Sequence, residues 1–565
     1  MITLRPHQVV AIQDEQRLRL NPLTRNILVV LPTGAGKSLT LADYARADYQ
    51  AGRHCIIFAH RDRLILQLSE ALCKMGVPHT FICSDKARRD ITNHNLKKFG
   101  DSFHDETSPI IISSNPTFAA RVKAGRIPDV LLNNMHRWIQ DEAHHATRDS
   151  ETWGTCLSCF PNAIGLGFTA TPLRNDKKGL GSHADGFFDA MSVTTTMWDL
   201  ITKGMLSPYK VFIPPTRIDR EKIKSNGNGD FTEVSAAKET DRKEVTGDAV
   251  DHYLRLSPGQ PAITFCVNIK HARHVAEEFN NRGVPSVAIS SKDSVDFIDQ
   301  AMTDFEEGRI LNLVNVDLIS EGYDSPMVIN CIMLRPTQSY SLFKQQAGRV
   351  LRTAEGKSFG IIQDHVGNVQ YMLRTYGLQY LHDDPEWSLD RETKRAKNDD
   401  GNKAEPWIIC PNAVCGFQYL ESEHGKTCPE CGHSETPDET EARIREMQTV
   451  DGDLVELQID AIEVLLAERE RVDKPVEQFA HTVSGLPTPA RLGAVNKHAK
   501  RLHAQVQLRD MIQRWCVDCG TRTGWSVDLV QREFSRVFGV HVLQAQTLGE
   551  RKAMELLERV RESGL

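Results

Sequence analysis

The sequence predicts an α/β protein with two tandem domains on parallel sheets, a small cysteine-rich segment and a mainly helical C-terminal region. Strand-sized apolar stretches alternate with helical patterns over residues 26–364, which is typical of β-α-β units. A polar stretch at 225–230 interrupts this alternation. We therefore expect one α/β domain over 1–207 and a second over 208–385.

Each expected strand is a short apolar run of the kind that a parallel sheet buries on both faces. In the first domain the runs are 27–31, 54–59, 110–113, 138–140 and 164–168. In the second domain they are 262–266, 286–289, 311–316, 328–334 and 359–363. The remaining chain divides into a charged linker at 386–406, a cysteine cluster at 407–434, and an acidic spacer with a helical region at 435–565.

The composition is that of a soluble globular protein, with 565 residues, 25% charged and 40% hydrophobic. No apolar stretch approaches the roughly 20 residues that a membrane span needs. The first residues lack the apolar core of a secretion signal, so we expect a cytoplasmic protein. The 13 cysteines are scattered except for four close pairs, which favours reduced thiols and a metal site over disulfides.

The net charge of −7 is unevenly distributed along the chain. Residues 435–470 hold twelve acidic and three basic side chains, whereas 491–514 hold six Lys or Arg and one Asp. The overall sign therefore does not exclude a nucleic-acid partner.

A glycine-rich turn follows the first expected strand and leads into a helical pattern. Its residues are Thr33, Gly34, Ala35, Gly36, Lys37 and Ser38. Glycines allow backbone N–H groups to turn inward around a phosphate, and the helix start adds partial positive charge. Lys37 is expected to reach the β- and γ-phosphates of ATP, and Ser38 to bind Mg²⁺. Leu31 stands where the strict pattern has glycine.

Two adjacent carboxylates, Asp141 and Glu142, follow the strand expected at 138–140, and His144 comes two residues later. A carboxylate at the carboxyl end of a strand is where a phosphate-loop ATPase holds Mg²⁺, and a neighbouring glutamate can polarise the attacking water. We expect Asp141 to hold Mg²⁺ through water and Glu142 to activate the water.

A third pattern, at 345–352, contains Gln345, Arg349 and Arg352. Arginines three residues apart on a helical turn point to one face, and from a second domain they can reach the γ-phosphate across a cleft. Such arginines supply roughly 10³–10⁵ of rate by neutralising transition-state charge. Hydrolysis would then require the two domains to close on each other.

These motifs, together with others in the same order over about 350 residues, resemble those of superfamily 2 helicases. Phrases around Gln8, at 167–174 and at 364–368 are similar to the bacterial and phage RadD-like group, which is related to XPB-like and type III restriction motor subunits. The resemblance implies two RecA-like domains that hydrolyse ATP with Mg²⁺ and act mostly on DNA. Gln140 and Ser320 depart from the usual motif residues.

The resemblance also implies roles for single residues. Gln8 would read adenine, and Gly322 and Asp324 would contact the nucleotide. His144, Thr169 and Thr171 would couple hydrolysis to movement. The residues on motifs that contact nucleic acid are Arg61, Ser114, Thr117, Asn268 and Ser320.

The cysteine cluster is typical of a zinc ribbon. Two pairs, Cys410 with Cys415 and Cys428 with Cys431, are separated by twelve residues. Four thiolates suit the tetrahedral coordination of a structural Zn²⁺ and leave no open position for catalysis. A further pair, Cys516 and Cys519, has no evident second pair, so we expect packing and leave metal binding open. The pair at 156 and 159 is expected in the core.

Basic residues at 491–514 are interleaved with apolar ones at helical spacing. The segment is either a helix that contacts a phosphate backbone or a solvated face of a small helical domain. We leave both alternatives open.

The sequence therefore predicts an ATP-dependent DNA helicase or translocase of replication, recombination or repair. Its expected partners are single-stranded, forked or branched DNA and a protein bound through the zinc ribbon or C-terminal region, without a membrane. The alternatives are a remodelling motor without net unwinding, the motor subunit of a restriction or defence complex, and an RNA helicase. Polarity and oligomeric state are not predicted.

Overall fold

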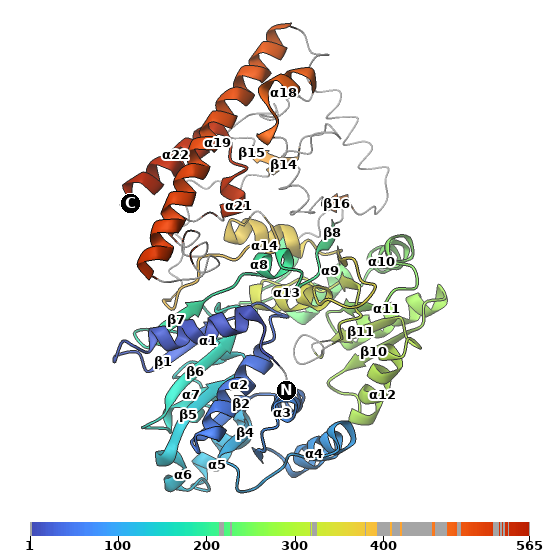
Figure 1. Cartoon of the computed structure of the whole chain (residues 1–565). Helices are drawn as coiled ribbons and strands as arrows, with labels where there is room; N and C mark the ends of the chain where they lie inside the picture. The colour runs from blue at the N-terminus through green and yellow to red at the C-terminus, as the bar shows by residue number, and fades with distance from the viewer. Residues whose placement is uncertain are drawn as a thin grey trace. The chain divides into compact units, whose positions relative to one another are not determined.

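The computed structural model describes residues 3–213, 220–226, 229–316, 318, 325–378, 380–391, 407–409, 418–420, 455–457, 472–482, 488–523, 530, 534, 537–538, 540 and 542–563. The chain divides into two compact units, Met1–Leu457 and Gln458–Leu565. The first unit contains two α/β lobes, drawn mostly in blue to cyan and in green to yellow in Figure 1, and each lobe has its own seven-stranded sheet.

The first lobe has an all-parallel sheet in the order β3-β4-β2-β5-β6-β1-β7. Its strands are β1 (Asn26–Val30), β2 (His54–Ala59), β3 (Thr80–Ile82), β4 (Ile110–Ser114), β5 (Met135–Gln140), β6 (Ile164–Thr169) and β7 (Ala190–Val193). Its helices are α1 (Pro6–Leu18), α2 (Lys37–Gln50), α3 (Asp62–Lys74), α4 (Asp85–Phe99), α5 (Asn115–Lys123), α6 (Asp129–Asn134), the 3₁₀ turn η1 (Ala143–His145), α7 (Trp153–Ser158) and α8 (Met197–Thr202). The central strands are almost wholly buried, because helices cover both faces of such a sheet.

The second lobe has the strand order β10-β11-β9-β12-β13-β8-β16, and only β16 runs antiparallel to its neighbour. Its strands are β8 (Tyr209–Ile213), β9 (Ala262–Phe265), β10 (Ser286–Ser290), β11 (Asn312–Val316), β12 (Asn330–Met333), β13 (Gly360–Asp364) and β16 (Val455–Leu457). Its helices are η2 (Arg220–Lys222), α9 (Glu233–Thr240), α10 (Lys243–Leu256), α11 (Ile269–Asn281), α12 (Val295–Glu306), α13 (Tyr340–Ala347), η3 (Gly348–Val350) and α14 (Asn368–Tyr376).

The two parallel sheets confirm the predicted fold class of tandem RecA-like α/β domains, and all ten expected strands are present. The prediction missed β3, β7, β8 and β16, which are short or lie at or next to a sheet edge. An edge strand such as β7 is only partly buried, so it lacks the apolar run that marks a central strand.

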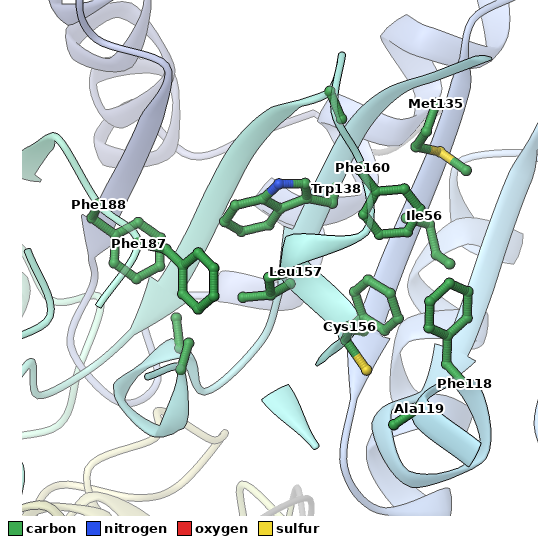
Figure 2. Packing of buried hydrophobic residues seen from close by; sticks show 14 of the residues in the cluster. Ile56, Phe118, Ala119, Met135, Trp138, Cys156, Leu157, Phe160, Phe187 and Phe188 are labelled. Carbon is green, nitrogen blue, oxygen red and sulfur yellow. The ribbon is translucent and has the colours of Figure 1, made fainter. Parts of the chain in front are cut away.

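Aromatic side chains fill much of the core on one face of the first sheet. In Figure 2, Trp138 of β5 lies between Phe187 and Phe188 on one side and Phe160 on the other. The ring centroids of Trp138 and Phe188 are 6.1 Å apart. Cys156 is fully buried in the same cluster, which confirms the expectation of a core thiol.

The chain returns to the first lobe after completing most of the second. Lys344 of α13 donates from Nζ to the carbonyls of Leu381 and Asp383, at 2.8 Å each. A few residues later the amide of Gly181 in the first lobe donates to Leu389 O at 2.8 Å. Trp387 and Leu389 pack against the core of the first lobe. Trp387 also lies 6.0 Å from Tyr340 of α13 between ring centroids, so the described start of the predicted linker contacts both lobes.

The described part of the second unit contains helices α18 (Val476–Thr482), α19 (Thr488–Thr523), α21 (Val542–Ala545) and α22 (Glu550–Glu562). Leu508, Trp515, Phe534 and Leu557 belong to its hydrophobic core. Among the described residues, no helix combines the length and apolar character that crossing a membrane requires.

Candidate active site

The glycine-rich turn lies between the end of β1 and the start of α2, as the sequence predicts. Gly34 and Gly36 both have a φ of +84°, a left-handed conformation that glycine adopts without strain. Gly36 is the N-cap of α2, which begins at Lys37. Thr33 and Ala35 are buried, whereas Lys37 and Ser38 are partly exposed. The positive end of a 14-residue helix therefore faces the turn.

Helix α1 fixes the turn from one side. Gln8 donates from Nε2 to Gly36 O at 2.8 Å and accepts at Oε1 from the Arg5 amide at 2.7 Å. His7 contacts Ala35 O through Nε2 at 2.7 Å. A Cβ on Gly36 would lie 2.6 Å from Gln8 Nε2, so glycine is also required for this approach. Gln8, expected to read adenine, is thus also a support of the phosphate turn.

Asp141 and Glu142 follow β5 and are both largely buried. Glu142 has a φ of +48°, and its amide donates to Asp141 Oδ1 at 2.9 Å. Burial, and then the neighbouring charge of Glu142, raise the pKa of Asp141 above its usual range, while the Lys37 ammonium acts in the opposite direction. The site therefore carries negative charge that a cation would neutralise, and oxygen donors such as Asp141 and Ser38 suit Mg²⁺.

Gln140 is a polar residue in a buried strand, and its hydrogen bonds explain why it is there. Its Nε2 donates to Asp141 O at 2.7 Å, and its Oε1 accepts from Asn115 Nδ2 at 2.8 Å. Gln140 and Asn115 are both fully buried. This pair links the start of α5 to the carboxylate segment, a support that the sequence does not reveal.

A chain of polar side chains extends from Glu142 toward the second lobe. His144 Nδ1 lies 3.4 Å from Glu142 Oε2 and 3.0 Å from Thr169 Oγ1. The Thr171 amide donates to Thr169 Oγ1 at 3.1 Å, and Thr171 Oγ1 donates to Ser341 Oγ at 2.6 Å. The three predicted coupling residues are therefore connected to one another.

The arginine-bearing segment of the second lobe lies against the phosphate turn. Helix α13 ends at Ala347 and continues as the 3₁₀ turn η3, in which residues three apart share a face. A Cβ on Gly348 would lie 2.6 Å from Thr33 Cγ2, and Arg352 Cγ lies 3.9 Å from the Cβ position of Gly34. Gln345 and Arg349 are buried. The structure thus brings Arg352 and the phosphate turn together.

The residues expected to contact nucleic acid lie at helix starts. Arg61 and Ser114 are the N-caps of α3 and α5, and Asn268 caps α11 by accepting from the His271 amide at 2.9 Å. A hollow of about 440 Å³ at α5 is lined by Pro116, Thr117, Ala120, Arg121 and Arg126. Ser320, Gly322 and Asp324 lie outside the described residues.

The predicted zinc ligands Cys410, Cys415, Cys428 and Cys431 also lie outside the described residues. The described neighbours β14 (Trp407–Ile409) and β15 (Gln418–Leu420) pair antiparallel, with Ile409 opposite Gln418. Within the part of the chain that the structure describes, no group of three or more His, Cys, Asp or Glu side chains could hold a metal.

Helix α19 uses several of its basic residues within the second unit. Arg501 and Arg509 donate to backbone carbonyls of 546–548, and Arg509 also pairs with Asp473. Leu508 and Ile512 are buried as expected, but Leu492 and Val506 are more than half exposed. Cys519 is buried in the core and burial raises the pKa of Cys516 to about 11, which favours packing for this pair.

Two family models match the chain. "Type III restriction enzyme, res subunit" covers residues 1–174, and "Helicase conserved C-terminal domain" covers residues 246–354. The first match contains the phosphate turn, the carboxylate pair and Thr171, and the second contains the arginine pair. These domains imply the use of ATP and Mg²⁺.

Individual relatives are distant. A "51.5 kDa protein" of Lactococcus phage (isolate 7-9) is 28% identical over 435 residues, covering 76% of this chain and 84% of the phage protein. The "Putative ATP-dependent helicase IRC3" of Saccharomyces cerevisiae is 26% identical over 362 residues, covering 61% of this chain. The match spans 49% of the yeast protein.

Among solved structures, the DNA-bound "ATP-dependent Type ISP restriction-modification enzyme LlaBIII" aligns with a TM-score of 0.48 and 13% identity, over 100% of this chain and 40% of that chain. The two matched domains, in this order and with Arg352 beside the phosphate turn, indicate that the chain is a helicase-family ATP-dependent motor related to restriction-enzyme subunits and helicases.

Proposed function

We propose that the chain is a DNA translocase or helicase that hydrolyses ATP between its two lobes. The observation that carries the proposal is the close packing of Gly348 on Thr33, with Arg352 beside Gly34. This packing sets the arginine segment of one lobe against the phosphate turn of the other. A nucleotide bound at the turn would therefore be contacted from both lobes, and its hydrolysis would change how the lobes meet.

In the first lobe, the turn from Thr33 to Ser38 would hold the phosphates of ATP through its backbone and Lys37. Ser38 and Asp141 would hold Mg²⁺, which when bound neutralises charge on the β- and γ-phosphates. Glu142 is buried beside Asp141 and would orient and deprotonate the attacking water. Gln8 would support the turn and contact the base.

In the second lobe, Arg349 and Arg352 would stabilise charge that develops on the γ-phosphate, and Gln345 would contact the attacking water. Gly322 and Asp324 would contribute to the nucleotide site from the segment after β11. His144, Thr169 and Thr171 would transmit the state of the site to the second lobe. We base this last assignment on their hydrogen bonds and the contact with Ser341.

We propose DNA as the track, because the first domain matches a restriction-enzyme subunit and such enzymes act on DNA. Arg61, Ser114 and Thr117 in the first lobe and Asn268 and Ser320 in the second would contact the strand. Helix starts suit phosphates because their free N–H groups carry partial positive charge.

We also propose a structural zinc ribbon at 407–434. The paired strands β14 and β15 enclose a stretch of eight residues, 410–417, that contains Cys410 and Cys415. With Cys428 and Cys431 these thiols would form a four-sulfur set of the type that Zn²⁺ prefers. The ribbon and the C-terminal unit would select the DNA structure or a protein partner.

The test measures ATP hydrolysis with no nucleic acid and with single-stranded DNA, duplex DNA, forked DNA and RNA. K37A serves as the control for hydrolysis that belongs to this site. We expect strong stimulation by one form of DNA, lost in K37A. An ATPase rate that no nucleic acid changes would contradict DNA as the proposed track but would still support the proposed ATPase activity. Greater stimulation of ATP hydrolysis by RNA than by DNA would indicate that RNA is the track.

A second candidate is the motor subunit of a restriction or defence complex, which the match to a restriction subunit over 1–174 favours. Such a subunit would translocate or remodel without net unwinding, and a partner chain would supply cleavage. A triplex-displacement assay beside a strand-displacement assay separates these two activities. Displacement of the third strand without separation of a forked duplex would favour this candidate.

A further inference from the structure

A buried hydrogen bond between two hydroxyl groups joins the lobes beside the active site. Thr171 Oγ1 in the first lobe donates to Ser341 Oγ in the second at 2.6 Å. Thr171 is 2% exposed and Ser341 is 8% exposed, so little water reaches this contact. Ser341 Oγ also lies 3.4 Å from Leu173 O, which can accept its proton. Ser341 belongs to none of the motifs that the sequence reveals.

Two buried side chains, His144 and Thr169, lie between Thr171 and the carboxylate pair. Thr169 has one hydroxyl proton, which it donates to Thr171 O at 3.1 Å. With the hydroxyl proton in that direction, the Thr169 oxygen can accept from His144 Nδ1, which lies 3.0 Å away, in the tautomer that carries a proton on Nδ1. The same N–H lies 3.4 Å from Glu142 Oε2. Hydrogen bonds thus run from His144 through Thr169 to Thr171, and Glu142 Oε2 lies next to the His144 end of this series.

On the other side, Ser341 is connected to the arginines by the backbone of one short helical segment. It lies in the first turn of α13, which continues directly into η3 and Arg349. Gly348 at this junction packs on Thr33. A displacement of Ser341 from Thr171 would therefore be carried along the segment to the contact between Gly348 and the phosphate turn.

We propose that Ser341 is a positioning residue for ATP hydrolysis. Its hydroxyl holds the start of α13 on Thr171, so that Arg349 and Arg352 meet the phosphate turn only when Glu142, His144 and Thr169 are aligned. The inference rests on the proposed ATPase site but not on the identity of the nucleic acid. Ser341 acts through other residues and has no contact with the reacting atoms.

The effect of Ser341 belongs to the closed arrangement of the lobes. Lys37 and Ser38, which would hold ATP, belong to the first lobe and do not depend on this bond. Loss of the bond would therefore lower kcat and leave the KM for ATP nearly unchanged. When S341A removes the hydroxyl of Ser341, the buried hydroxyl of Thr171 is left without a hydrogen-bond partner. This costs more free energy than the lost bond alone, because no water takes the place of the missing partner. We expect S341A to lower kcat by about three- to tenfold.

The experiment is a double-mutant cycle of S341A and T171V, with kcat and KM measured with and without single-stranded DNA. Valine keeps the shape of threonine and the backbone bonds of residue 171 but removes its hydroxyl. If the two hydroxyls act as one contact, each variant and the double variant will show about the same loss of kcat. T171S, which keeps the hydroxyl, should retain kcat near the wild-type value.

The matched control is S339A. Ser339 is the N-cap of the same helix and accepts from the Leu342 amide at 3.3 Å. S339A removes a helix cap without touching the contact between the lobes, so we expect lower thermal stability with kcat within twofold of wild type. Thermal unfolding of every variant identifies losses that come from misfolding.

Wild-type kcat in S341A, or a loss in the double variant equal to the product of the single losses, would overturn the proposal. In either case a K37A variant without activity would still support the proposed ATPase. An inactive wild-type protein would instead contradict the proposed function itself. A loss in S341A that appears as a raised KM would show that Ser341 supports nucleotide binding and would also overturn the proposal.

Discussion

Two buried acidic sites in the first lobe differ in how their charge is balanced. Asp48, in α2, is fully buried and accepts from Arg137 Nε at 2.6 Å and from Arg53 at 2.8 Å. Asp141 lies beside a second carboxylate, and burial and that neighbour raise its pKa. A balanced pair of this type holds structure together, whereas an unbalanced one indicates a site that awaits a cation or substrate.

The largest expected effect is on chemistry at the unbalanced site. E142Q removes the group that would deprotonate water, and we expect kcat to fall by about 10²–10⁴-fold while ATP binding remains. Because one of two adjacent negative charges is removed, thermal stability should be equal or higher. Steady-state ATPase rates, nucleotide titration and thermal unfolding measure these quantities.

The control for this variant is E70Q. Glu70 is a half-buried carboxylate that is paired with Lys98 and His94. The E70Q variant should therefore hydrolyse ATP at the wild-type rate. Equal loss of kcat in both variants would contradict the distinction between balanced and unbalanced carboxylates.

The next effect is on stability at the balanced site. R137L leaves the charge of Asp48 buried with much less compensation, so the free energy of unfolding of the first unit should fall by about 3–5 kcal/mol. Denaturant unfolding followed by tryptophan fluorescence measures it. The double variant D48N/R137L removes that charge as well and should recover part of the loss. No change in R137L would show that water already solvates Asp48.

The third prediction tests whether Arg349 and Arg352 of the second lobe supply positive charge at the phosphate turn. A Cβ on Gly348 would lie 2.6 Å from Thr33 Cγ2, so G348A should hold the arginine segment away from the phosphate turn. We expect kcat to fall by about tenfold, from the usual cost of overpacking. G247A in α10, where a Cβ meets no neighbour within 4 Å, is the matched control and should keep full activity.

The smallest expected effect concerns Gln140, whose hydrogen bonds support the backbone at Asp141. Q140L removes the bonds to Asn115 Nδ2 and Asp141 O and should cost about 1–2 kcal/mol of stability. Because the backbone of Asp141 loses one contact, kcat should also fall by about three- to fivefold. N115A, which removes the hydrogen bonds between Asn115 and Gln140 but keeps the one from Gln140 to Asp141 O, should reduce stability without the same loss of kcat.

The sequence is sufficient to predict features that depend on local backbone chemistry. The phosphate turn needs glycine at 34 and 36 because both have a left-handed backbone, and the strand before it is apolar because both of its faces are buried. The carboxylate pair was predictable for the same reason, because it directly follows a strand. The residue assignments drawn from these motifs remain predictions of function.

Features that depend on contacts between distant segments could not be predicted. Ser341 meets Thr171 across 170 positions, and nothing in the local pattern around either residue signals the other. Asp230 lies in the polar stretch that marked a domain gap, yet it accepts from the Gln338 amide at 2.7 Å. Gln140 looked like a departure from a motif until its bonds to Asn115 and Asp141 were known.

The return of the chain onto the first lobe limits how a motor of this design can move. The lobes are joined once by the residues before β8 and again by 381–391, where Lys344 and Gly181 bind successive parts of one strap. Two connections between the lobes define a line that can serve as a rotation axis. While the strap stays docked, relative motion is confined largely to rotation about that line, so each cycle of opening and closing would retrace one path.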